Sequence, residues 1–160
     1  MRNIDIFESY SALLLAHLYE HFPLRVNINA YELAMEIDEE LWSESKKPLE
    51  HAPFIQKYIR HKSPVGLAKP TIQWLKLAGL IDYESENDSE FRNMVLTPKG
   101  LESIKVDPSV ESKLLKAAES ILVDATKETA QKELKEVFSE IISWCARNVP
   151  SLINSIGSIN

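Results

Sequence analysis

The sequence is poor in cysteine, glycine and long apolar runs, and each shortage excludes a class of protein. Cys145 is the only cysteine among 160 residues, so no internal disulfide or cysteine-rich metal cluster is possible. The four glycines are well separated, and none belongs to a phosphate-binding glycine loop. The longest apolar run, Ala12 to Ala16, is far too short to span a bilayer. With no signal-peptide pattern either, we expect a cytoplasmic protein without membrane association.

Positive charge is also scarce, since 18 Lys and Arg oppose 24 Asp and Glu, giving a net charge of −6. This acidic balance argues against indiscriminate binding to nucleic acids. The distribution is uneven, however, because residues 46–76 contain seven Lys or Arg and one Glu, a net charge of +6. This basic segment is the strongest functional indication in the sequence, although lysines scattered over a solvated surface would give the same count.

The stretch from Pro70 to Gly100 predicts a helix, a β-hairpin and the start of another helix. Proline suits the first turn of a helix, and Gly79 suits the left-handed residue that ends one. Thr97 and Pro98 have the residue types of an N-cap and of the first helical position. The expected strands are Leu80 to Tyr83 and Phe91 to Leu96, joined by the polar run 84–90.

The remaining chain should be mostly helical. Apolar residues spaced by three or four predict a first helix over 7–22, ended by Pro23. A short strand over 25–28 follows, and Asn29 with Glu32 forms the pattern of a helix N-cap. Further helices are expected after Asn29, over 53–61, and from Thr97 to an interruption near Asp107-Pro108.

Residues 110–149 contain neither glycine nor proline and predict one long helix, or two with a smooth join, broken by Pro150. A heptad-like seam follows Leu114, Ala118, Ile121 and Ala125 and resumes at Leu134, Phe138, Ile141 and Cys145. We interpret this seam as a homodimer interface, with folding back onto the same chain as the alternative. Beyond Pro150, an apolar tail contains Leu152, Ile153, Ile156 and Ile159, and it must either dock on a surface or fray.

The order of helix, short strand, two helices, hairpin and helix resembles the winged helix-turn-helix superfamily over about residues 5–105. Trp74-Leu75-Lys76-Leu77-Ala78-Gly79-Leu80-Ile81 is similar to a recognition helix entering the first wing strand. Leu96-Thr97-Pro98-Lys99-Gly100-Leu101 is similar to the exit from the second wing strand. The resemblance implies a mostly α fold with a small β-hairpin. The domain organisation that it implies is a winged-helix domain over 1–106, with an insertion at 38–69, followed by a helical extension over 107–160.

The resemblance also implies a non-enzymatic DNA-binding protein, such as a transcriptional regulator, without a cofactor. Its recognition helix would lie in the major groove, with Thr71, Gln73 and Lys76 facing outward. Gln73 could contact adenine through its amide, whereas Lys62 and Lys69 would lie near phosphates. Arg92 is the basic residue of the wing. Together these six residues form the predicted interface with double-stranded DNA.

The wing itself favours another interpretation, because it is acidic. Glu84, Glu86, Asp88 and Glu90 alternate with small polar residues and would repel phosphates. Winged helices also serve as protein-binding modules. The alternative is therefore an adaptor that binds a protein through the acidic wing or the apolar tail.

A third and distant possibility is zinc hydrolysis. His17, Glu20 and His21 match the H-x-x-E-H pattern, which places two potential zinc ligands on one helix face with a glutamate as base. No third ligand is evident, so histidines on a helix surface are the simpler interpretation, and we expect no metal. Cys145 falls on an apolar face and is expected to be a core residue.

Overall fold

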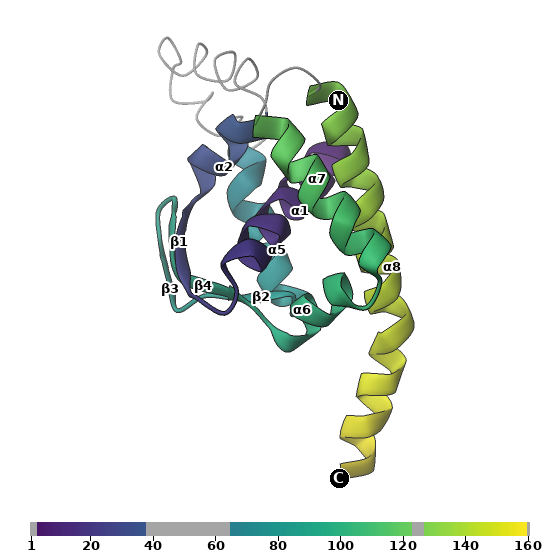
Figure 1. Ribbon diagram of the computed structural model, residues 1–160. Coiled ribbons are helices and arrows are strands. Elements are labelled where there is room, and N and C mark those ends of the chain that lie inside the picture. Colours follow the sequence, from purple (N-terminus) through teal and green to yellow (C-terminus); the bar gives the residue numbers. More distant parts are fainter. Residues whose placement is uncertain (1–2, 38–64, 123–126, 160) are drawn as a thin grey trace.

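The computed structural model describes residues 3–37, 65–122 and 127–159, with side chains described for 3–34, 66–121 and 128–148. In chain order the elements are α1 (Asn3–His21), β1 (Val26–Asn29), α2 (Ala30–Ile37), the 3-10 turn η2 (Val65–Leu67), α5 (Ala68–Leu77), β2 (Ile81–Asp82), β3 (Ser85–Asn87), β4 (Glu90–Leu96), α6 (Pro98–Lys105), α7 (Pro108–Leu122) and α8 (Lys127–Ile159) (Figure 1). The expected fold class, mostly helical with a small β-hairpin and a long C-terminal helix, is confirmed. The helix expected at 53–61 lies outside the described residues.

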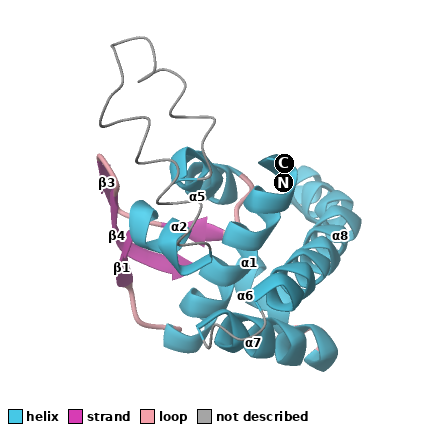
Figure 2. Cartoon of the chain, turned by 90° about the horizontal axis from the view of Figure 1, so that it is seen from above, coloured by secondary structure: helices cyan, strands magenta, loops and turns pink. Residues whose placement is uncertain are grey.

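Helix α1 is the centre of the core, surrounded by α2, α5, α7 and α8 (Figure 2). All residues from Ser9 to Ala16 are buried, so the helix is covered on every side over two turns. This explains the apolar run within it. The helix begins at Asn3, earlier than the expected start at Phe7, because its first turn also packs on neighbouring helices.

The small sheet is antiparallel and has β4 at its centre, in the order β1–β4–β2, with β3 also paired to β4. Phe91 of β4 lies opposite Ile28 of β1 and Glu86 of β3. The polar run 84–90 was expected to be the turn, but Ser85–Asn87 pairs with β4. The turn therefore contracts to the tip, where Asp88 has a φ of 57°. Aspartate tolerates this left-handed conformation better than most residues do.

Three helix boundaries predicted from residue type are confirmed. The Asn29 side chain accepts hydrogen bonds from the backbone N–H groups of Tyr31 (2.9 Å) and Glu32 (3.3 Å), which caps α2. Thr97 caps α6 by accepting from the Gly100 N–H at 3.0 Å, with Pro98 beginning the helix. The interruption after α6 also occurs where it was expected, since α7 begins at Pro108.

The C-terminal region forms two helices, α7 and α8, that pack side by side (Figures 1 and 2). The single long helix and the smooth join considered from the sequence are both wrong, because neither a continuous helix nor two collinear helices could pack against themselves along their lengths. The break expected at Pro150 is also wrong, since α8 continues to Ile159.

The seam interpreted as a homodimer interface is buried within this chain. Its described members, among them Leu114, Leu134 and Ile141, are less than 1% exposed, and α7 and α8 both pack on α1. Folding back, the alternative considered from the sequence, accounts for this seam. Polar contacts support the packing: Asp5 of α1 lies 2.6 Å from the Lys135 ammonium of α8.

Candidate nucleic-acid interface

Helix α5, the predicted recognition helix, is anchored by a buried side and a defined C-terminal end. Ile72 and Leu75 are fully buried against the core, as the sequence predicted. Gly79 has a φ of 81°, which allows its N–H to bond the Lys76 carbonyl at 3.0 Å. The Leu80 N–H bonds the Leu75 carbonyl at 3.0 Å, completing a Schellman motif. The chain therefore leaves α5 directly into β2, and the hairpin is held beside the helix.

The structure describes five of the six residues of the predicted DNA interface, four of them on α5 and one on β4. Gln73 and Lys76 are exposed on α5, and Lys69 is half-buried on the same helix. Arg92 is exposed on β4. Lys62 lies outside the described residues.

The expectation that Thr71 faces outward is wrong. Its side chain is 3% exposed, and its hydroxyl donates a 2.6 Å hydrogen bond to the Leu67 carbonyl. Position 71 lies next to Ile72 on the buried side of α5, and α1 and α2 both pack on this helix. Because the side chain is buried and its hydroxyl proton is used in this bond, Thr71 does not belong to the outer face of α5.

The two exposed polar residues of α5, Gln73 and Lys76, are engaged by the acidic hairpin. The Gln73 amide donates to both carboxylate oxygens of Glu86, at 3.1 and 3.3 Å. The Lys76 ammonium donates to the Tyr83 carbonyl at 3.1 Å and lies 3.7 Å from the Asp82 carboxylate. It also lies 4.1 Å from the centre of the Tyr83 ring. The hairpin thus satisfies the same groups that would read or neutralise DNA.

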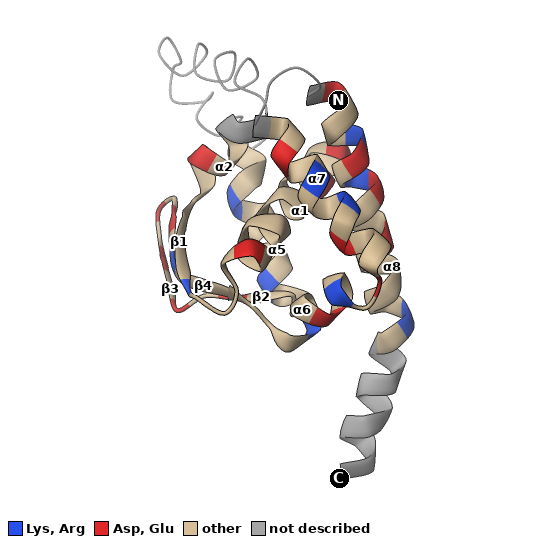
Figure 3. Ribbon diagram, in the orientation of Figure 1, with Lys and Arg blue, Asp and Glu red and all other residues tan. Residues whose placement is uncertain are grey.

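The hairpin brings more negative charge to this side of α5 than the helix brings positive charge. Its carboxylates are Asp82, Glu84, Glu86, Asp88 and Glu90, and Figure 3 shows acidic positions along both of its strands. Burial raises the pKa of Tyr83, and the nearby Glu86 and Asp82 carboxylates raise it further. The charge expected to repel phosphates is therefore held directly beside Gln73 and Lys76.

Sequence reasoning missed the apolar flank of α5. Trp74 is 41% exposed, and Leu77 is 84% exposed. The Trp74 ring makes an edge-to-face contact with Phe7 of α1, with 5.1 Å between centroids. The helical spacing indicates this exposure, because neither Trp74 nor Leu77 lies on the inward-facing side of α5 that Ile72 and Leu75 form.

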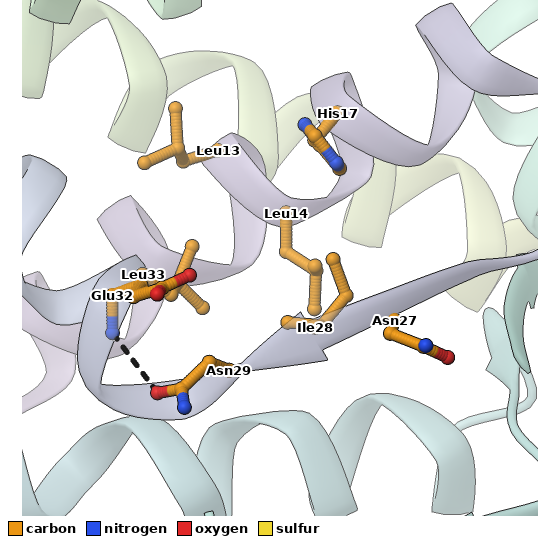
Figure 4. A pocket seen from close by; sticks show the side chains of 8 residues that line it. All are labelled: Leu13, Leu14, His17, Asn27, Ile28, Asn29, Glu32 and Leu33. Carbon is orange, nitrogen blue, oxygen red and sulfur yellow. Dashed lines mark hydrogen bonds between the residues drawn. The ribbon is translucent and has the colours of Figure 1, made fainter. Parts of the chain in front are cut away.

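A second candidate site is a small pocket between α1, β1 and α2, with a volume of about 160 Å³ (Figure 4). The His17 ring and the Glu32 carboxylate lie on opposite sides of it, with Leu14 and Ile28 between them. Asn29 also lines the pocket, but its side-chain oxygen already accepts the hydrogen bond that caps α2. The pocket is too small to bind an organic ligand, and its polar groups either lie on opposite sides or already form hydrogen bonds within the chain.

The H-x-x-E-H pattern on α1 has the geometry of surface histidines. The rings of His17 and His21 lie 4.4 Å apart, and the His21 Nδ1 is 2.9 Å from the His17 carbonyl oxygen. Partial burial lowers the pKa of His17, His21 lowers it further, and Glu20 opposes both effects. Among the residues that the structure describes, no three His, Cys, Asp or Glu side chains are grouped to hold a metal.

Comparisons with protein-family models, with curated proteins and with solved structures find no match for this chain. Within the described ranges, no helix has both the length and the apolar character needed to cross a membrane. Cys145, expected to be a core residue, is 6% exposed, and burial raises the pKa of its thiol.

Proposed function

We propose that this chain is a winged-helix module that binds duplex DNA through the outer face of α5. The observation that carries the proposal is the arrangement of elements around that helix. Strand β1 pairs with β4, β4 pairs with β2, and α5 directly precedes the hairpin. In a winged helix, this arrangement makes α5 the recognition helix and β3–β4 the wing.

The outer face of α5 offers a small set of contacts. Gln73 carries the amide that can bond adenine in two places, and Lys69 and Lys76 can neutralise phosphates. Gln73 must first leave Glu86, but exposed hydrogen bonds and ion pairs contribute only about 1 kcal/mol or less. The hairpin stays off the DNA backbone, because its carboxylates repel phosphates.

Salt dependence and charge reversal test this proposal together. Two or three phosphate contacts predict that log K falls with log salt concentration at a slope of about −2 to −3. Titration of labelled duplex by fluorescence anisotropy should show this slope for the wild type. The double variant Lys69→Glu, Lys76→Glu should abolish binding. The control double variant Lys116→Glu, Lys132→Glu makes the same charge change at exposed positions on α7 and α8, and it should lose less affinity.

Equal losses in both double variants would show that only net charge matters and would reject the α5 interface. Equal binding by the wild type and the α5 double variant would reject it as well.

A protein-binding adaptor is the second candidate, favoured by the contacts of the acidic hairpin. Glu86 and Asp82 already bind the polar groups of α5, and Trp74 and Leu77 present apolar surface beside them. A partner for the hairpin would carry a basic surface. This candidate predicts no duplex binding by the wild type even at the lowest salt, so the same titration separates the two functions.

A further inference from the structure

An apolar groove lies between the first turns of α1 and the first half of α5, with a volume of about 460 Å³. Ile4, Phe7, Leu67, Pro70 and Trp74 provide its apolar lining. Ile4 is 48% exposed and Trp74 is 41% exposed, so water reaches the groove from outside. An exposed apolar surface of this kind marks a site for an apolar partner.

The groove is poorly suited to a polar ligand. Its polar lining comes from Asn3 and Thr71, and the Thr71 hydroxyl is already bonded to the Leu67 carbonyl. The two walls are helices, and a third helix with an apolar side is the element that packs into such a surface. A helical segment with an apolar stripe and no charged residue has the character needed to fill it.

The end of α8 has this character. The helix continues to Ile159, and in Figure 1 its last turns extend past α6. The sequence places Leu152, Ile153, Ile156 and Ile159 at helical spacing, and residues 148–160 contain no charged side chain. Its Ser and Asn residues fall on the other side, and an amphipathic helix of this kind normally buries its apolar stripe against a partner surface.

A chain cannot place this end in its own groove. Lys135 of α8 contacts Asp5, beside the groove, at 2.6 Å. At about 1.5 Å per residue, Leu152 lies roughly 25 Å farther along the same helix. Figure 1 accordingly shows the two ends of the chain at opposite ends of the molecule.

We infer that residues 149–159 of one copy dock in the groove of a second copy. Two antiparallel copies related by a twofold axis make this contact twice, and the assembly is then closed. The dimer differs from the one expected from sequence, because the seam of α7 and α8 is used inside each chain. This inference goes beyond the proposed DNA binding and does not depend on it.

The full-length chain tests the inference by sedimentation velocity over a concentration series. The wild type should dimerise. Ile153→Asp in the tail and Trp74→Glu in the groove should each raise the dimer dissociation constant at least 10-fold. Leu77→Glu is the matched control, because this residue lies on α5, is 84% exposed and does not line the groove. Circular dichroism checks that each variant is folded, and Ile156→Asp replaces Ile153→Asp if that variant is not.

Mixing the two variants identifies the pairing directly. The Trp74→Glu chain keeps an intact tail, and the Ile153→Asp chain keeps an intact groove, so an equimolar mixture should form dimers that neither variant forms alone. A contact between two tails gives no such rescue.

A monomeric wild type at every concentration would overturn the inference. So would a Trp74→Glu chain that dimerises as tightly as the wild type, or a mixture without rescue. No DNA enters these measurements, so their failure is distinct from a failure of the duplex titration.

Discussion

Replacing Gly100 with alanine should destabilise the fold far more than the same change in an ordinary helix. A Cβ at this position would lie 2.0 Å from the Leu80 carbonyl oxygen and 3.0 Å from its carbon. Carbon–oxygen contacts need about 3.3 Å, so α6 and Leu80, the residue before β2, must separate by roughly 1 Å. The movement also disturbs the Thr97 cap, because the Thr97 N–H donates to the same Leu80 oxygen at 3.1 Å.

The magnitude follows from these two effects. Overpacking costs about 1–3 kcal/mol, and loss of an N-cap costs about 1 kcal/mol. The higher helix propensity of alanine returns less than about 1 kcal/mol. Because backbone atoms form the obstacle, no side chain can rotate away, and we expect Gly100→Ala to lower the free energy of unfolding by about 3 kcal/mol.

Urea unfolding followed by circular dichroism measures this loss, with Gly79→Ala as the matched control. A Cβ on Gly79 meets only the Lys99 Cδ, at 3.9 Å, so its cost is the strain of φ at 81°, about 1–2 kcal/mol. A Gly100→Ala variant within about 1 kcal/mol of the wild type would refute the close approach of α6 to β2. A greater loss for Gly79→Ala than for Gly100→Ala would refute it equally.

Three contacts of α1 give further predictions. The Tyr19 hydroxyl donates to Glu111 at 2.6 Å, and this bond, with burial, raises the pKa of Tyr19 from 10.0 to about 12. Tyr19→Phe should cost about 1 kcal/mol below pH 10, and the difference from the wild type should vanish between pH 10 and 12, as measured by urea unfolding across pH. Asp5→Ala and Lys135→Ala should be non-additive in a double-mutant cycle of unfolding free energies, because either change alone already breaks their ion pair, and Lys135→Ala leaves the buried Asp5 carboxylate without this cation. Because folding lowers the pKa of His17, the unfolded chain binds a proton at this histidine more readily than the folded chain does. The free energy of unfolding should therefore fall as the pH drops below about 6.5, and His17→Gln should reduce this decrease.

Local signals predicted the elements well because their causes lie within a few residues. Asn29 and Thr97 cap helices with their own side chains, and Gly79 adopts the left-handed conformation that its missing Cβ permits. The buried positions Ile72 and Leu75 follow from helical period alone. Each of these features depends on neighbouring residues and not on the arrangement of distant segments.

The failures share a different cause, since each depends on what another segment does. Thr71 is buried on the side of α5, a helix on which α1 and α2 both pack. Gly100 matters because α6 meets β2, and no spacing in the sequence encodes that distance. The apolar run from Ala12 to Ala16 did signal a helix covered on all sides, and combining it with the seam of α7 and α8 would have predicted folding back.

Duplex DNA and the α8 tail, the two proposed ligands, would compete for α5. Trp74 lines the groove, and the adjacent Gln73 belongs to the duplex-binding face. A helix about 10 Å across, seated over Trp74, covers part of that face. Dimerisation would then oppose duplex binding and would not supply a second half-site. Added duplex should release monomers in sedimentation experiments, and Ile153→Asp should bind duplex more tightly than the wild type at concentrations where the wild type dimerises. Weaker binding by Ile153→Asp would mean that the dimer presents both recognition helices to DNA, with the tail clear of α5.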